Sequence, residues 1–160
     1  MPTHLLEREQ WIGRSVEDVF AFFSNAENLA RITPPWLTFR ILSPTPIAME
    51  VGTRIAYQIR WRFVRMNWTS EIVDWQPNRS FVDRQIEGPY ALWHHTHSFQ
   101  RDVAGTLMRD TVRYELPLGP LGDIAHRLKV KSDLESIFDY RAIQIRALLQ
   151  DSKPLIMQEL

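Results

Sequence analysis

The middle of the chain, residues 36–115, alternates in hydrophobicity with a period of two, and this constrains the fold more than any other feature. It contains six segments rich in β-branched and aromatic residues, each bounded by Pro, Gly, Asn or Asp, which is typical of β-strands. The segments are WLTFRILS, TRIAYQIRW, RMNWTSEIVDW, SFVDRQIE, YALWHHTHSFQ and TLMRDTVRYEL. Parallel neighbours need a crossover of about a dozen residues or more, and the links here are shorter. The pattern therefore predicts a six-stranded antiparallel meander.

Helical patterns lie on both sides of this meander. A further strand, HLLEREQWI, comes first, and Ser15 followed three residues later by an acid predicts a helix over residues 16–24. A second short helix, AENLARIT, follows Asn25 and must end at Pro34. After Pro120 a helical period continues to about residue 150. Its apolar stripe consists of Leu121, Ile124, Leu128, Leu134, Phe138, Ile145 and Leu148.

The length of this last helix predicts how the parts assemble. A helix of about 30 residues is about 45 Å long and needs a large apolar surface, which only the sheet can provide. We therefore predict an α+β helix-grip fold. A curved antiparallel sheet of seven strands wraps around the long C-terminal helix and encloses a ligand-sized cavity. Residues 1–152 form one domain in this prediction, and residues 153–160 form a C-terminal tail.

Composition excludes several classes of function. Nineteen Lys and Arg balance nineteen Asp and Glu, so no net charge favours binding to nucleic acid. Cysteine is absent, which removes disulfides, thiolate nucleophiles and cysteine-based metal sites. No apolar run approaches the roughly 18 residues of a membrane span, and the N-terminus does not resemble a signal peptide. We expect a cytoplasmic protein without membrane insertion. We also expect no cofactor, because no nucleotide, flavin or haem motif occurs.

The apolar face of the predicted sheet carries an unusual set of polar residues. Alternation places on one face the residues Tyr57, Ser70, Asp83, Gln85, His95, His97, Asp110 and Tyr114, together with Trp, Phe and Ile. Arg141 joins them, because it lies three residues after Phe138 on the apolar stripe of the helix. Charged residues are almost never fully buried unless they are paired, so these side chains must bind one another or meet water.

Hairpin geometry indicates which of them are neighbours. If the Gly88-Pro89 turn centres its two strands, Asp83 lies opposite His95 and Gln85 lies opposite Trp93. The next turn places Asp110 beside either His95 or His97, and the pattern leaves this choice open. Side chains directly opposite each other are close enough for carboxylate–imidazole hydrogen bonds.

The order of these segments resembles one protein superfamily along essentially the whole chain. The residues that carry the likeness are VFAFFSNAENLARITPPWLTF, WTSEIVDWQP, FVDRQIEGPYALWHHTHSF, GTLMRDTVRYELPLG and IFDYR. They resemble the START/polyketide-cyclase-like (SRPBCC) superfamily of helix-grip proteins, and more narrowly its bacterial ligand-binding domains. This resemblance implies the fold predicted above and a cavity for a hydrophobic ligand such as a lipid, sterol, polyketide or quinone.

Three functional hypotheses follow. The preferred one is binding of a small hydrophobic or amphipathic ligand by Tyr57, Trp68, Ser70, Asp83, Gln85, Trp93, His95, His97, Asp110, Tyr114, Phe138 and Arg141. Arg141 then suggests an acidic, carbonyl or phosphate group on the ligand. The alternative is a cyclase or dehydratase that uses acid–base chemistry, with His95, His97, Asp83 and Asp110 as the catalytic candidates. A metal site at the His-x-His pair, completed by one of the two Asp residues, is a weaker hypothesis. The same cluster could also serve only to fix the register of the strands.

Overall fold

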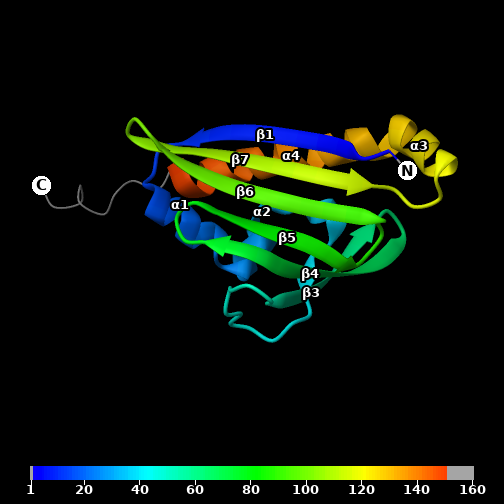
Figure 1. The fold of residues 1–160 in the computed structure, drawn as a ribbon, viewed down its shortest axis with the longest axis horizontal. Helices are drawn as coiled ribbons and strands as arrows, with labels where there is room; N and C mark the ends of the chain where they lie inside the picture. Colours follow the sequence, from blue (N-terminus) through cyan, green and yellow to red (C-terminus); the bar gives the residue numbers. More distant parts are fainter. Residues whose placement is uncertain (1, 151–160) are drawn as a thin grey trace, which may run out of the picture.

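A curved seven-stranded antiparallel sheet, in the order β1-β7-β6-β5-β4-β3-β2, forms the frame of the molecule (Figure 1). The computed structural model describes residues 2–150, with no description of the Gln150 side chain. The strands are β1 (His4–Ile12), β2 (Arg40–Ile41), β3 (Arg54–Trp61), β4 (Val64–Gln76), β5 (Ser80–Glu87), β6 (Leu92–Asp102) and β7 (Gly105–Glu115). The fold predicted from the sequence is confirmed. The predicted tail, residues 153–160, lies outside the described residues.

Short helices follow β1 and a long helical segment ends the described chain. The first group comprises α1 (Val16–Phe23), η1 (Ala26–Asn28), α2 (Leu29–Ile32) and η2 (Pro35–Leu37). The long segment comprises α3 (Pro120–Ala125), η3 (His126–Val130), α4 (Lys131–Ile145) and η4 (Arg146–Gln150). Figure 1 shows α4 running behind the sheet, along β1 and β7. No helix within residues 2–150 is both long and apolar enough to cross a lipid bilayer.

The start of α1 follows from its sequence. The Ser15 side chain accepts a hydrogen bond from the backbone N–H of Asp18 at 3.1 Å, which satisfies one of the free donors of the first turn. Val19, Phe20 and Phe23 then point into the core, where Phe20 meets Phe99 edge to face. This packing closes one end of the sheet.

One predicted strand is largely wrong. The segment WLTFRILS forms only the two-residue strand β2, where Arg40 and Ile41 pair with Gln58 and Tyr57. Its first part is the short helix η2 instead, because Pro34 and Pro35 fix the backbone angles and provide no N–H for a sheet ladder. Thr38 at φ 47° then turns the chain out of this helix. The remaining segments form β3 to β7 as predicted.

The apolar stripe of the long helix is confirmed only in its second half. Leu134, Phe138 and Ile145 are buried against the sheet, as predicted. Leu121, Ile124 and Leu128 are exposed instead, and their predicted place on the stripe is wrong. The π-helical segment η3 lies between the two halves, and its wider turn shifts the phase of the side chains. The first half therefore buries different residues, Gly122 and His126.

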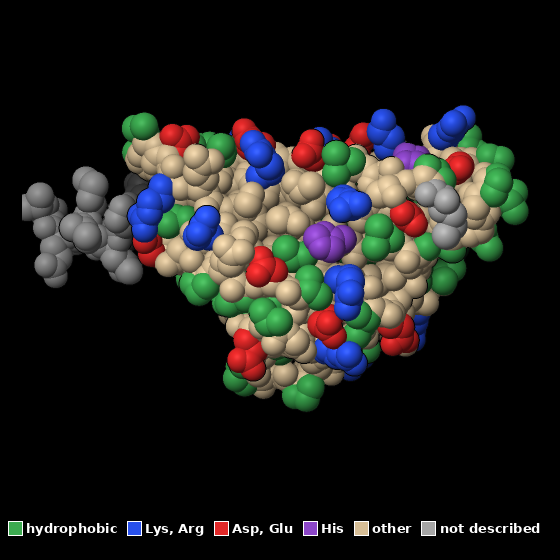
Figure 2. Space-filling model, viewed as in Figure 1, with side chains coloured by type: hydrophobic (Ala, Val, Ile, Leu, Met, Phe, Trp, Pro, Cys, Tyr) green, Lys and Arg blue, Asp and Glu red, His purple; other side chains and the backbone are tan. Residues whose placement is uncertain are grey.

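The two faces of the sheet are sorted as alternation predicts. The inner face buries two clusters of apolar residues, one around Phe20, Phe81 and Phe99 and one around Trp68, Trp93 and Phe138. The outer face carries charges of both signs, spread over the view in Figure 2. Between the two apolar clusters lie the buried polar residues of the inner face, which form the site described next.

Candidate functional site

A cavity of about 370 Å³ lies between the inner face of the sheet and the helices α2 and α4. This volume is within the range of small-molecule sites, about 300–1,000 Å³. Nine of the twelve residues that the sequence predicts as ligand contacts line it: Tyr57, Trp68, Ser70, Asp83, Trp93, His95, His97, Phe138 and Arg141. The rest of the lining is mainly aliphatic and aromatic. The cavity is therefore apolar except at the end where the Asp and His side chains gather.

The other three predicted contacts lie outside this lining. Gln85 exchanges hydrogen bonds with the backbone of Tyr90, at 2.7 and 3.2 Å, and closes the turn between β5 and β6. The β5–β6 ladder has the predicted register but ends at Arg84 and His94, one residue before the predicted pair of Gln85 and Trp93. Asp110 lines a separate cavity of about 60 Å³ between β1 and α4.

Tyr114 belongs to a different contact at the end of β7. Its hydroxyl lies 2.8 Å from Nε2 of His126, and the His126 ring stacks on His4 with ring centroids 3.5 Å apart. This contact joins β1, β7 and η3. Tyr114 thus holds the helical segment to the sheet and does not itself line the cavity.

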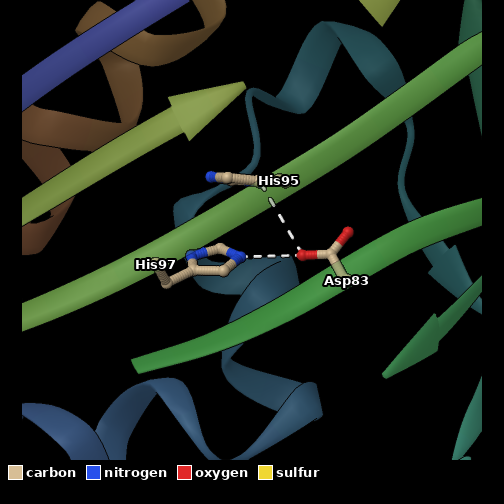
Figure 3. A group of neighbouring side chains, drawn as sticks. All are labelled: Asp83, His95 and His97. Atoms are coloured by element: carbon tan, nitrogen blue, oxygen red, sulfur yellow. Dashed lines mark hydrogen bonds and ion pairs between the residues drawn. The ribbon is translucent and has the colours of Figure 1, made fainter. Parts of the chain in front are cut away.

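The polar end is a network in which imidazoles stand between two carboxylates. His97 Nε2 lies 2.7 Å from Asp83 Oδ2 (Figure 3), and His95 Nε2 lies 2.8 Å from Asp110 Oδ1. The sheet register explains both contacts, because Asp83 pairs with His95 and Asp110 pairs with His97. The predicted pairing of Asp83 with His95 is confirmed, and the choice left open for Asp110 is settled. Each histidine bonds diagonally, to the carboxylate next along the face.

The second nitrogen of each ring faces the other carboxylate. His97 Nδ1 is 3.2 Å from Asp110 Oδ1, but it has no partner in hydrogen-bond geometry within residues 2–150. His95 Nδ1 is 3.8 Å from Asp83 Oδ2, beyond hydrogen-bond distance. The two rings lie close together, with centroids 3.7 Å apart. Phe81 stacks on the far side of His97 at 4.2 Å and fixes the plane of that ring.

Arg141 of α4 supplies the cation of the network. One of its guanidinium nitrogens lies 3.5 Å from Asp110 Oδ1. The central carbon of the guanidinium lies 5.3 Å from the ring centroid of Phe23 and 5.8 Å from that of Phe138. Aromatic faces attract a desolvated cation. Nε of Arg141 is buried and has no hydrogen-bond partner within the described part of the chain. The helix therefore brings a charge to the sheet that Asp110 balances.

The charges of the network balance when the two rings share one extra proton. Burial alone would raise the pKa of Asp110, but Arg141 and the two histidines outweigh it and hold this pKa well below its usual range. For His97, burial lowers the pKa, and Asp110 and Asp83 raise it further than burial lowers it. For His95, burial and the neighbouring His97 lower the pKa. Of the two rings, His97 therefore holds a proton to the higher pH, and with one proton on it two carboxylates face one imidazolium and one guanidinium.

The tautomer of His95 follows from its partner. Because the low pKa keeps Asp110 ionised, its oxygen can only accept, so His95 Nε2 must donate its hydrogen to it. The Nδ1 of a neutral His95 then has a free lone pair, 3.8 Å from Asp83 Oδ2. An imidazole oriented in this way by a carboxylate is the arrangement of a general base.

Two residues with hydroxyl groups, Tyr57 and Ser70, line the same cavity. The indole Nε1 of Trp68 donates to Ser70 Oγ at 3.0 Å, and Ser70 in turn stabilises the ionised form of Tyr57. Burial and the negative charge of Asp83 outweigh this effect and raise the pKa of Tyr57. The Tyr57 hydroxyl is therefore a neutral donor.

The same network includes a group of atoms that could hold a metal ion. Asp83, His95 and His97 each provide one possible ligand atom, and these three atoms lie within 4.8 Å of one another. Two of these contacts are carboxylate–imidazole pairs within the network described above. A metal would displace the proton of His97 and add positive charge beside Arg141.

Apart from Phe138 and Arg141, sequence reasoning missed the part of the lining that comes from helices. The residues Phe22, Asn28, Leu29, Ile32 and Asp133 all line the cavity. Short helices give no readable apolar stripe, so their inward side chains have no periodic signal. Asp133 is also the partner of Trp61, whose indole Nε1 donates to it at 3.2 Å. No alternation pattern could have revealed this contact.

Comparison with known protein families identifies the family of this chain. Residues 12–134 match the profile of the family described as polyketide cyclase/dehydrase and lipid transport. This match covers most of the chain. The chain belongs to the polyketide cyclase/dehydrase and lipid transport family. Curated proteins give no match to the sequence.

Solved structures confirm the helix-grip fold for this family member. The Zhui aromatase/cyclase from Streptomyces sp. R1128 has a TM-score of 0.76 at 15% identity, with 98% of this chain and 99% of that chain covered. CV1439 from Chromobacterium violaceum has a TM-score of 0.72 at 12% identity, covering 93% and 99%. Ginseng major latex-like protein 151 from Panax ginseng has a TM-score of 0.64 at 13% identity, covering 92% and 97%. At these identities the likeness concerns the fold alone.

Proposed function

We propose that this chain binds one small hydrophobic or amphipathic molecule, such as a lipid, polyketide or quinone, in the cavity between the sheet and α4. The main support for this proposal is the cavity, whose walls are aromatic and aliphatic and whose polar groups are gathered at one end. That combination of apolar contact and a few convergent polar groups is the usual design of small-molecule sites. The family description and the name of the aromatase/cyclase relative also support it.

The charges at the polar end favour a neutral group on the ligand. Asp83 faces the cavity, and its pKa is lowered, since burial is outweighed first by the hydrogen bond from His97. Arg141 also lines the cavity, but its guanidinium is already paired with Asp110. An anionic ligand would therefore meet a carboxylate, and the network has no spare positive charge to balance it. A hydroxyl or a carbonyl fits better, with Asp83 as acceptor and Tyr57 as donor.

A cavity-filling variant tests the proposal. Ala26 is buried and lines the cavity, so Ala26→Leu places three more carbon atoms in the space for the ligand. Ala147, exposed near the end of the long helix, provides the matched control Ala147→Leu. We expect the neutral fluorescent probe N-phenyl-1-naphthylamine to bind the wild type and the control alike, and the cavity variant at least about tenfold more weakly. Equal binding by all three proteins would refute the cavity as the site.

Acid–base catalysis is the second candidate function, and the orientation of His95 favours it. Its Nδ1 lone pair and the Tyr57 hydroxyl both lie at the cavity, where they could move a proton from and to a bound carbonyl compound. Such groups suit the aldol cyclisations and dehydrations of polyketides. The proton taken up by Nδ1 would leave His95 as an imidazolium, held by Asp110.

The test of this second function uses the histidines themselves. A β-polyketone thioester is the substrate, and aromatic product formation is followed by absorbance. We expect His95→Phe to abolish any cyclisation while His94→Phe, on the outer face of the same strand, retains it. Equal rates for the wild type and the variant lacking both His95 and His97 would reject the catalytic assignment. Binding of the fluorescent probe shows in parallel that each variant is folded.

A further inference from the structure

An exposed apolar ridge lies on the first part of the C-terminal helix. Leu121, Ile124 and Leu128 are spaced three and four residues apart, so they share one face, and they are 67%, 55% and 77% exposed. Leu118, just before the helix, is exposed as well. Figure 2 shows hydrophobic side chains at this end of the molecule, which Figure 1 identifies as the end with α3. We call these four residues the apolar ridge. Large contiguous apolar patches on a protein surface commonly mark sites that contact a partner or a membrane.

The opposite side of this helix is locked to the sheet, so the ridge cannot turn inward. His126 is buried on that side, where it bonds to the Tyr114 hydroxyl at 2.8 Å and stacks on His4. Gly122 packs tightly against the backbone of the loop that precedes the helix. A Cβ atom at this position would lie 2.3 Å from the carbonyl oxygen of Pro117. The backbone contact therefore fixes the rotation of α3 and holds the ridge toward solvent.

Positive charges flank the ridge. Arg127, Lys129 and Lys131 follow one another at alternate positions, and Asp123 is the one acidic residue within residues 118–132. Lys129 pairs with Asp133 at 2.7 Å. Arg127 and Lys131 form no ion pair with any carboxylate within residues 2–150, so their charges are free to meet an external anion. A helix with an apolar face between cations is typical of binding at a membrane surface.

The ridge lies at one end of the cavity. Leu116, two residues before Leu118, and Val130, two residues after Leu128, both line the cavity and are half-buried. Trp61 is another half-buried lining residue, and its bond to Asp133 holds the turn between β3 and β4 at this same end. The tip of that turn is Phe63, which is 90% exposed. Exposed apolar groups of two separate elements thus lie next in sequence to residues that line the cavity.

We propose that this end of the molecule docks onto the surface of an anionic lipid bilayer. The apolar ridge enters the boundary between headgroups and acyl chains, while Arg127 and Lys131 contact the lipid phosphates. The cavity end then faces the bilayer, so that an apolar ligand passes between the membrane and the cavity without crossing water. The docking itself does not require the proposed ligand binding, but this transfer role rests on it.

A second copy of this chain is a less suitable occupant of the ridge. In a twofold dimer the same patch of both copies meets, so the cations beside one ridge would approach those of the other. Like charges brought together at an interface oppose association. An anionic bilayer matches both the apolar ridge and the charges around it.

Vesicle sedimentation with the full chain tests this proposal. The vesicles contain either phosphatidylcholine alone or phosphatidylcholine with phosphatidylglycerol. We expect the wild type to sediment with the anionic vesicles, and less so as salt is added. Replacing Leu121, Ile124 and Leu128 with Gln should weaken this binding at least about tenfold, and Arg127→Gln with Lys131→Gln should reduce the preference for phosphatidylglycerol.

Two controls separate the possible explanations. Val103, 86% exposed at the turn between β6 and β7, lies at the opposite end of the sheet, so Val103→Gln should leave sedimentation unchanged. Without vesicles, the ridge variant should still bind N-phenyl-1-naphthylamine like the wild type, which separates this proposal from the ligand-binding one. Wild type that stays in solution with both vesicles, or a ridge variant that binds them equally well, would overturn membrane docking. A dimer that only the ridge variant loses, without vesicle binding, would also overturn it.

Discussion

Removal of the charge of Asp110 should show how tightly the polar network is coupled. Asp110 is 6% exposed and contacts His95 at 2.8 Å, His97 at 3.2 Å and Arg141 at 3.5 Å. The variant Asp110→Asn keeps the size of the side chain but leaves the guanidinium of Arg141 buried without its anion. Breaking one partner of a buried ion pair costs about 3–5 kcal/mol. For a chain of this length that loss lowers the unfolding midpoint by about 6–20 °C.

The double variant Asp110→Asn with Arg141→Met separates this cost from a general loss of packing. Replacing both members of a buried pair by uncharged groups is often nearly neutral, so the double variant should recover most of the lost stability. Urea unfolding, followed by tryptophan fluorescence, measures the free energy of unfolding of the wild type and of each variant. A single variant within about 1 kcal/mol of the wild type would refute the reasoning. So would a double variant that is no more stable than the single one.

The pH dependence of these proteins provides a second check on the same network. The pKa of Asp110 is lowered on folding, so its contribution is present above its unfolded-state pKa of about 3.9 and is lost as the pH falls through the folded value. The pKa of His97 is raised, so its contribution is complete below about 6.5 and is lost as the pH rises through the folded value. In Asp110→Asn, stability should therefore change less with pH, both in the acidic range and above about 6.5.

Three further outcomes follow from the structure. In NMR titrations, the ring of His97 should titrate above about 6.5 and that of His95 below it, and the same value for both would contradict a single shared proton. Leu134→Ala should cost about 2–5 kcal/mol of stability, while Leu128→Ala, on the exposed part of the same helix, should change it by less than about 0.5 kcal/mol. Equal losses would contradict the phase shift at η3. Chelation of divalent metals should leave the unfolding midpoint unchanged, because the network is already neutral with one proton, and a clear decrease would instead indicate a structural metal.

Much of the fold was predictable because alternation is a strong signal in half-buried strands. It placed Asp83, His95, His97 and Asp110 on one inner face, and turn geometry paired Asp83 with His95. Whether Asp110 lies beside His95 or His97 could not be predicted, because this depends on the register that the β6–β7 turn imposes, and the sequence of the turn does not determine it. The structure pairs Asp110 with His97.

The features that sequence reasoning missed depend on backbone details. The stripe over Leu121, Ile124 and Leu128 assumed a regular helix, whereas the π-helical η3 changes the phase before Leu134. Likewise, the predicted strand after Pro35 assumed that β-forming side chains decide its structure. The prolines and the left-handed Thr38 decide it instead.

The indole N–H resonances of the tryptophans provide the most direct test of the ligand-binding claim. Trp68 and Trp93 are buried and line the cavity, whereas Trp11 and Trp36 are exposed outside it. Titration with a neutral amphiphile such as 1-dodecanol should shift the signals of Trp68 and Trp93 in a saturable way and leave those of the other two in place. Shifts confined to Trp11 and Trp36, or no saturable shift at all, would contradict a ligand site between the sheet and α4.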